Sequence, residues 1–237
     1  MISLMSYLLK SYTRSQRYFG PLAGVVIAVL VLYSYKPNPI MNSYSATAVI
    51  LFICCAAMGL SFLNHEQPVQ RQVVIVHLRS ARKHSIGAIL SLLLVTLILD
   101  ILIVIYPIAT EQFPGPVGGY RLMLALVGHA LLGLLGIAIS LFLQSSWVSK
   151  ASYATGLMLA VIILSIGGTQ ISDVLHGPLI PLRFLLPPVA PLMNALMDGD
   201  TRPFSAMLAT FFQTGLYSAV LITVYLYRTG KKDHTRR

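Results

Sequence analysis

Long apolar runs, separated by short polar or basic stretches, dominate the pattern along this chain. Six such runs cover residues 17–35, 43–62, 86–107, 122–143, 152–171 and 204–227. A helix needs about 20 apolar residues to cross the hydrocarbon core of a bilayer. Strands of a membrane barrel would be about 10 residues long and would alternate between apolar and polar positions, which these runs do not. The pattern therefore predicts an all-α membrane protein with six transmembrane helices.

Composition agrees with this pattern. Of the 237 residues, 56% are hydrophobic and only 10% are charged, whereas a soluble domain carries roughly 25% charged residues. The predicted spans use most of the chain, so we expect a single transmembrane domain over residues 1–237, without a soluble catalytic domain.

Basic residues set the expected topology. The net charge of +10 comes from Lys and Arg at the ends of the apolar runs, which indicates membrane orientation rather than a nucleic-acid partner. If both termini are cytoplasmic, only four of the 17 Lys and Arg lie outside: Lys36, Arg121, Arg183 and Arg202. Because cytoplasmic loops carry an excess of Lys and Arg, we expect an N-in, C-in protein of a cell membrane, the bacterial plasma membrane.

Residues 1–16 form an amphipathic segment ahead of the first run. The apolar positions Ile2, Met5, Leu8, Leu9 and Tyr12 recur at helical spacing, and basic side chains occupy the other face. Such a helix lies in the membrane interface. The alternative is that this segment only extends the first span.

Two connections between spans are unusual. Residues 64–85 form the longest cytoplasmic loop, with Glu66, Pro68 and a helical stretch too short to cross a membrane. Such a stretch could lie at the interface or in a protein groove. Residues 172–202 are rich in proline but remain apolar. Because proline interrupts helices, we predict short broken helices that enter the outer leaflet and return, as an extracellular re-entrant segment.

Small residues recur every four positions in the first and fifth runs. These stripes are Gly20, Gly24 and Ala28, and Ser152, Gly156 and Ala160. Small residues on one stripe let helix backbones approach closely. The two runs are therefore predicted to provide packing surfaces, at least one of them toward a second subunit.

Motifs for catalysis are missing from the sequence. We find no phosphate-binding loop, no zinc-protease motif and no nucleophile elbow, and three histidines in the long cytoplasmic loop lack metal-site spacing. We therefore expect no catalytic residues, metal or cofactor in this chain. Asp100 and His129 lie at similar predicted depths in runs three and four, and an acidic residue inside a span is costly. They are interpreted as a hydrogen-bonded pair, either structural or a proton- or substrate-binding site.

This layout resembles the membrane subunit of ATP-binding-cassette (ABC) exporters, in the type-two, ABCG-like (type V) permease family. Residues 2–17 would be the connecting helix of that family, and Glu66 stands where members often carry an acidic residue after span two. In that family a coupling helix in this loop is followed by a Ser/Pro-Arg segment that leads into span three, which residues 78–83 suit, and the proline-rich residues 186–191 suit the re-entrant segment. The family often has Gly-Lys near the start of span three, where this chain has Gly87-Ala88.

The resemblance implies a function and partners. Two copies of an ABC ATPase would bind and hydrolyse ATP with Mg, and a second permease copy or paralogue would form the other wall of the path through the membrane lipids. Coupling to the ATPase is expected at Glu66, Val74, Leu78, Arg79 and Arg82. The apolar runs one, two and five favour a hydrophobic or amphipathic cargo, such as a peptide, drug or lipid. The alternatives are a non-ABC membrane protein that confers immunity or binds lipid or peptide, and an intramembrane enzyme that uses Asp100 and His129.

Overall fold

The computed structural model describes residues 1–174 and 184–234, and these residues form helices without any strand. Pro178, Pro181, Arg183, Arg236 and Arg237 lie outside the described residues. The prediction of an all-α protein is confirmed for the described part of the chain.

The N-terminal segment is a separate helix, as expected. Helix α1 (Ile2–Ser15) ends at Gln16, which has a left-handed backbone with φ of 55°. Helix α2 (Phe19–Leu32) follows at an angle of 80° to α1. The apolar face of α1 packs onto the rest of the molecule through Leu4, Leu8 and Tyr12. Because of this bend, α2 begins later and is shorter than the predicted first span.

Among the described residues, four helices are long and apolar enough to cross a membrane, and up to five if the bent pair α1 and α2 counts as one. They are α3 (Ile40–Leu63), α5 (Ala81–Ala109), α6 (Gly119–Ser140) and α10 (Phe204–His234). These four correspond to the predicted spans two, three, four and six. The structure is that of a helical membrane protein, and within residues 1–174 and 184–234 fewer than six helices reach spanning length.

The predicted fifth span is broken. Helix α7 (Ala151–Ile166) has 16 residues and ends at Gly167, and α8 (Gly168–Val174) begins directly afterwards. Two successive glycines weaken a helix, because glycine has the greatest backbone freedom to lose. Further along, Pro188 precedes α9 (Val189–Met197), whose first turn contains Pro191. In the described part of residues 172–202 the chain thus forms the end of α8 and the short helix α9, whereas entry into the outer leaflet and return stay a prediction.

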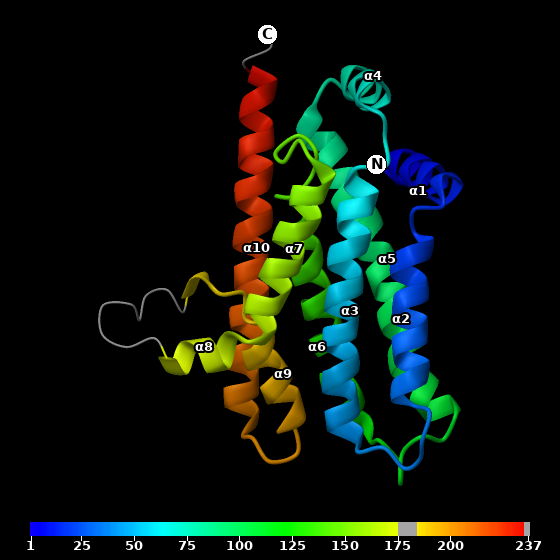
Figure 1. Cartoon of the computed structure of the whole chain (residues 1–237), viewed down its shortest axis with the longest axis vertical. Helices are drawn as coiled ribbons and strands as arrows, with labels where there is room; N and C mark the ends of the chain where they lie inside the picture. Colours follow the sequence, from blue (N-terminus) through cyan, green and yellow to red (C-terminus); the bar gives the residue numbers. More distant parts are fainter. Residues whose placement is uncertain (175–183, 235–237) are drawn as a thin grey trace.

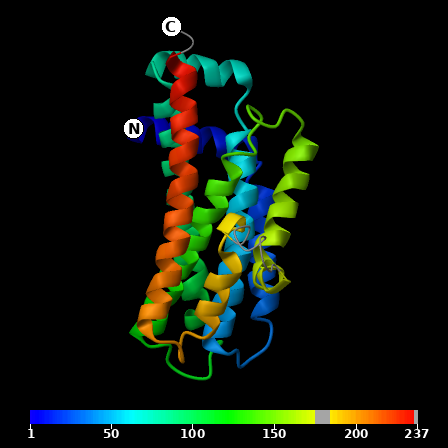
Figure 2. The same ribbon diagram turned by 90° about the vertical axis from the view of Figure 1, so that its left-hand side faces the viewer.

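Helices α3 and α6 form the centre of the bundle. Helix α2 lies on one side of them and α7 and α9 lie on the other, whereas α5 and α10 both pack against α6 and against each other (Figures 1 and 2). The backbones of α3 and α6 come close because of glycine: a Cβ atom at Gly136 of α6 would lie 2.6 Å from the Phe52 oxygen of α3. Gly59 of α3 faces Ser140 of α6 in the same way.

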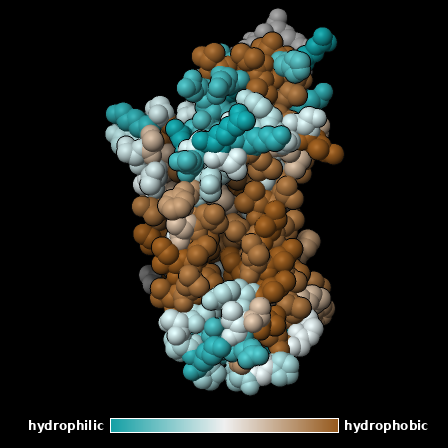
Figure 3. Space-filling view, turned by 90° about the vertical axis from the view of Figure 1, so that its right-hand side faces the viewer, coloured by the Kyte–Doolittle hydropathy of each residue, from teal (hydrophilic) through white to brown (hydrophobic). Residues whose placement is uncertain are grey.

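The two ends of the bundle differ. Helix α1, the short helix α4 (Pro68–Leu78) and the C-terminal end of α10 lie together at one end, which we call the α4 end (Figure 1). Helix α9 and the connections after α2 and α5 lie toward the opposite end, the α9 end. On the face shown in Figure 3, a band of apolar side chains lies between two regions rich in hydrophilic side chains. This band has the distribution expected of a surface in contact with lipid.

Candidate functional site

Helix α4 stands at the end of the bundle, and no residue of this helix is buried. Pro68 starts the helix, where its missing N–H costs no hydrogen bond. Arg79 ends it with a left-handed backbone, φ 54°, and Ser80 then caps α5 by accepting a hydrogen bond from the Lys83 N–H. These two caps turn the chain between α4 and α5, so α4 is a helix separate from the span that follows it.

The two faces of α4 differ in exposure. Val69, Val73 and Val76 share one face and are 70%, 64% and 75% exposed. Val74 and Leu78 point the other way and pack against the apolar cluster formed by α1, α2, α3 and α5. The apolar face left exposed is that of the three valines, whereas Val74 and Leu78 hold α4 against the bundle. Coupling at Glu66, Val74, Leu78, Arg79 and Arg82 stays a prediction. The i, i+4, i+7 spacing of the valines was visible in the sequence, but it does not tell which face is turned inward.

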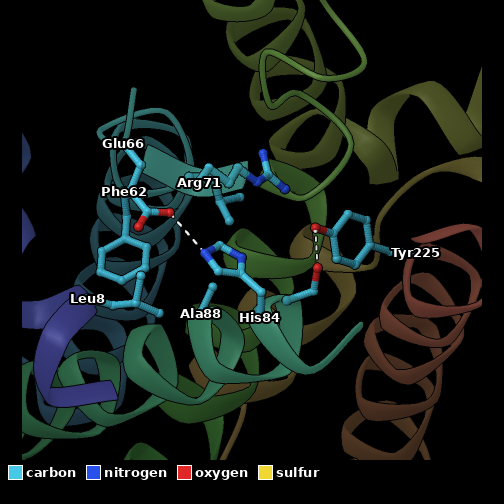
Figure 4. Close-up of a pocket in the computed structure, with 9 residues that line it drawn as sticks. Leu8, Phe62, Glu66, Arg71, His84, Ala88 and Tyr225 are labelled. Carbon is cyan, nitrogen blue, oxygen red and sulfur yellow. Dashed lines mark hydrogen bonds and ion pairs between the residues drawn. The ribbon is translucent and has the colours of Figure 1, made fainter. Parts of the chain in front are cut away.

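A buried ion pair fixes the base of α4. His84 Nε2, in the first turns of α5, lies 2.9 Å from Glu66 Oε2, and both side chains are only 5% exposed (Figure 4). Burial raises the pKa of Glu66, but the hydrogen bond and charge of His84, with His65 and Arg71 nearby, outweigh this and hold the pKa below its ordinary value. Charge-assisted hydrogen bonds of this kind are about twice as strong as neutral ones.

The ion pair lies where several helices meet. It lines a small cavity with Leu8 of α1, Phe62 of α3, Arg71 of α4 and Tyr225 of α10 (Figure 4). The cavity thus brings a residue of α4 together with residues of α1, α3, α5 and α10.

Further polar contacts connect the same end of the bundle. The Tyr225 hydroxyl accepts a hydrogen bond from Gln144 Nε2 at 2.9 Å and lies 3.2 Å from the Ser85 hydroxyl. Asn64 accepts from Arg17 and from the Ser145 N–H, both at 2.7 Å. The predicted coupling residues Arg79 and Arg82 are exposed on either side of the turn into α5.

The predicted bond between Asp100 and His129 is not formed. Both side chains are buried, but His129 Nδ1 donates to the Ala125 carbonyl at 2.8 Å, and Nε2 lies 2.9 Å from the Thr47 hydroxyl. Among the described residues, Asp100 Oδ1 has no hydrogen-bond partner. Because both ring nitrogens are engaged elsewhere, His129 has no group left for Asp100.

The predicted small-residue stripes face outward. Gly20, Gly24, Ser152, Gly156 and Ala160 are exposed, and Ala28 is half-buried. A Cβ atom at Gly20, Gly24 or Gly156 would meet nothing within 4 Å. Neither stripe mediates close packing inside the chain, so contact with a second subunit stays a prediction.

Comparison with protein-family models, curated proteins and solved structures finds no match to this chain. Within the residues that the structure describes, no group of three His, Cys, Asp or Glu is placed to hold a metal ion. The geometry of the α4 end and the sequence resemblance are what support a function.

Proposed function

We propose that this chain is the membrane-spanning permease subunit of an ATP-driven exporter, with ATP hydrolysed by a separate ABC ATPase. One observation carries the proposal: α4 presents three exposed valines at the end of a membrane bundle while Glu66 and His84 tie its base to the spans. An amphipathic helix that lays its apolar face into a groove is a common mode of protein recognition. The groove would belong to the ATPase.

Coupling would follow from this arrangement. Closure of two ATPase subunits on ATP and Mg would move the groove and α4 with it. The Glu66–His84 pair joins the end of α3 to the start of α5, so the motion would reach both spans directly. The chain itself catalyses no reaction in this scheme, and its spans alternate between access to either side.

The assembly would have six membrane passes and a partner permease. Helices α2, α3, α5, α6, the broken series α7 to α9, and α10 would be the passes, with both termini and the α4 end in the cytoplasm. Both the excess of basic residues and the common location of α1 and the C-terminal end of α10 support this topology. A second permease copy or paralogue would contact the outward stripes of α2 or α7.

The cargo would be hydrophobic or amphipathic: a peptide, a drug or a lipid. The outward faces of α2 and α7 are apolar, with exposed residues such as Ile27, Val31, Leu157 and Ile163. A path for a sugar or an ion would need more polar groups inside the membrane. Membrane lipids would surround the remaining faces.

The decisive experiment is co-purification with an ABC ATPase and measurement of coupled ATP hydrolysis. Val73→Asp places a charge on the exposed valine face, and we expect at least a tenfold loss of ATPase binding because the charge would be buried unpaired in the groove. The control is Gln70→Asp, which adds the same charge at an exposed position beside that face. Unchanged binding and coupling of the Val73→Asp protein would contradict the proposal.

A further inference from the structure

A basic and aromatic groove lies at the α4 end, apart from the Glu66–His84 pair. It has a volume of about 640 Å³ and is lined by Ser146, Trp147, Tyr227, Arg228 and Lys231. The lining comes from the end of α10 and from the connection between α6 and α7. This volume falls in the range of sites that hold a small molecule, roughly 300–1,000 Å³.

The cations of the groove are arranged over aromatic rings. The Arg228 guanidinium carbon lies 5.8 Å from the centre of the Trp147 ring, and Lys231 Nζ lies 4.9 Å from that of Tyr227. Trp147 is itself fixed by ring contacts with Phe142 and Tyr225 at 5.6 and 6.5 Å. Among the side chains that the structure describes, none that lines the groove is acidic. Its chemistry therefore suits an anion, and a guanidinium matches the paired oxygens of a phosphate.

The groove begins where an apolar stripe ends. Along α10, exposed large apolar side chains recur every three or four residues and form a stripe that winds around the helix: Phe204, Leu208, Phe212, Leu216, Val220, Val224 and Tyr227. The basic residues Arg228 and Lys231 follow within one turn. Tryptophan and tyrosine gather at membrane–water boundaries, and basic pockets between membrane helices bind anionic lipid head groups.

We propose that this groove binds the phosphate of an anionic phospholipid, whose acyl chains lie along the exposed stripe of α10. The stripe favours a lipid over free phosphate, because only a lipid has apolar chains to cover it. The inference requires only that α10 crosses the membrane, and it is independent of an ATPase.

Trp147 is the only tryptophan of the chain and a direct reporter of the groove. The full chain is placed in bilayers of phosphatidylcholine that contain a small fraction of either brominated phosphatidylglycerol or brominated phosphatidylcholine. Bromine quenches tryptophan fluorescence on contact. We expect stronger quenching by the anionic lipid, with a preference of about fivefold for each cation that contacts the phosphate. Equal quenching by the two lipids would overturn the proposal.

Variants test the assignment to these residues. Arg228→Gln with Lys231→Gln is expected to abolish the preference, and Lys10→Gln with Arg14→Gln, which removes the same charge from exposed positions of α1, is expected to keep it. If the double variant fails to accumulate, the single variants R228Q and K231Q are measured instead, and each is expected to lower the preference. An unchanged preference in the groove variants would overturn the proposal.

Loss of the preference on adding inorganic phosphate, but not chloride of equal ionic strength, would assign the groove to free phosphate instead. A change in Trp147 fluorescence that occurs only with an added ATPase would assign it to a protein.

Discussion

A single hydrogen bond joins the two buried titratable side chains of Glu66 and His84 at the α4 end. A carboxylate that is 5% exposed has lost most of its water, and His84 at 2.9 Å replaces part of that hydration. We predict that Glu66→Gln lowers the free energy of unfolding at pH 7 by about 1–3 kcal/mol, the contribution of a hydrogen bond to a charged group. Thermal unfolding of the purified protein in detergent measures this change.

The same pair predicts a pH dependence. Because the pKa of Glu66 is lowered in the folded protein, its stabilisation is complete above the ordinary pKa of glutamate and is lost as pH falls through the folded pKa. The difference between the wild type and Glu66→Gln should therefore shrink in acid. Glu111→Gln makes the same change at an exposed position, and its free energy of unfolding should equal that of the wild type both at pH 7 and in acid. A Glu66→Gln effect that stays constant down to pH 3 would contradict this account.

His129 and Asp100 should differ in their contributions to stability. His129→Ala removes two hydrogen bonds and leaves a cavity between α3 and α6, so we predict a loss of about 2–4 kcal/mol. Asp100 Oδ1 makes no hydrogen bond among the described residues, so Asp100→Asn breaks none there. We predict that it changes the free energy of unfolding by less than about 1 kcal/mol. Unfolding of both variants in the same detergent makes the comparison. A larger loss for Asp100→Asn than for His129→Ala would refute it.

The reason that sequence did not predict this arrangement is geometric. Counting residues from the ends of two spans gives depth in the membrane, and both side chains are indeed buried. It does not give the direction in which each side chain leaves its helix. Thr47, the actual partner of His129, is a hydroxyl in an apolar run, and such residues commonly bond to their own helix.

At the scale of elements, the sequence predicted which helices form, and in what order, better than it predicted how they pack. The amphipathic α1, the four long spans and the separate helix after Pro68 were all predictable from apolar runs, basic flanks and proline. The inward faces were not, because a span that is apolar all round gives no periodic signal. The close contacts form at Gly59 and Gly136, whereas the regular stripes of Gly20 and Gly156 point outward.

Two glycines should therefore respond differently to the same substitution. Leucine at Gly136 would push against the α3 backbone, with a Cβ atom 2.6 Å from the Phe52 oxygen, so we predict a loss of about 3 kcal/mol or failure to fold. Leucine at Gly156 enters open space, and the fold should be unaffected. If α7 contacts a second permease, Gly156→Leu should instead weaken that association. Unfolding and the mass of the purified assembly measure the two effects. A folded Gly136→Leu protein with wild-type stability would contradict the packing argument.

At the scale of the whole molecule, the α4 end gathers the features that would act together. Helix α4, the buried Glu66–His84 pair and the aromatic groove at Trp147 lie at one end of the bundle, and Tyr225 links the last two by contacting Ser85 and Trp147. An ATPase docked on α4 and a lipid in the groove would thus act on neighbouring parts of the same polar network. The α9 end has instead α9 and the connections after α2 and α5 (Figure 1).

The broken series α7 to α9 decides how many times the chain crosses the membrane. With 16 residues, α7 is about 24 Å long, shorter than the hydrocarbon core, so a complete crossing needs α9 as well. Single cysteines at the exposed positions Gly115, Ser149 and Thr201 test this without removing a basic residue that sets topology. The native Cys54 and Cys55 are 5% and 0% exposed, so they should not react with a membrane-impermeant maleimide. We predict that Gly115→Cys and Thr201→Cys are labelled in intact cells, and Ser149→Cys only after permeabilisation. Labelling of Ser149→Cys and Thr201→Cys from the same side would show that α7 to α9 enter and leave by one face, and α10 would then carry the C-terminus to the opposite side.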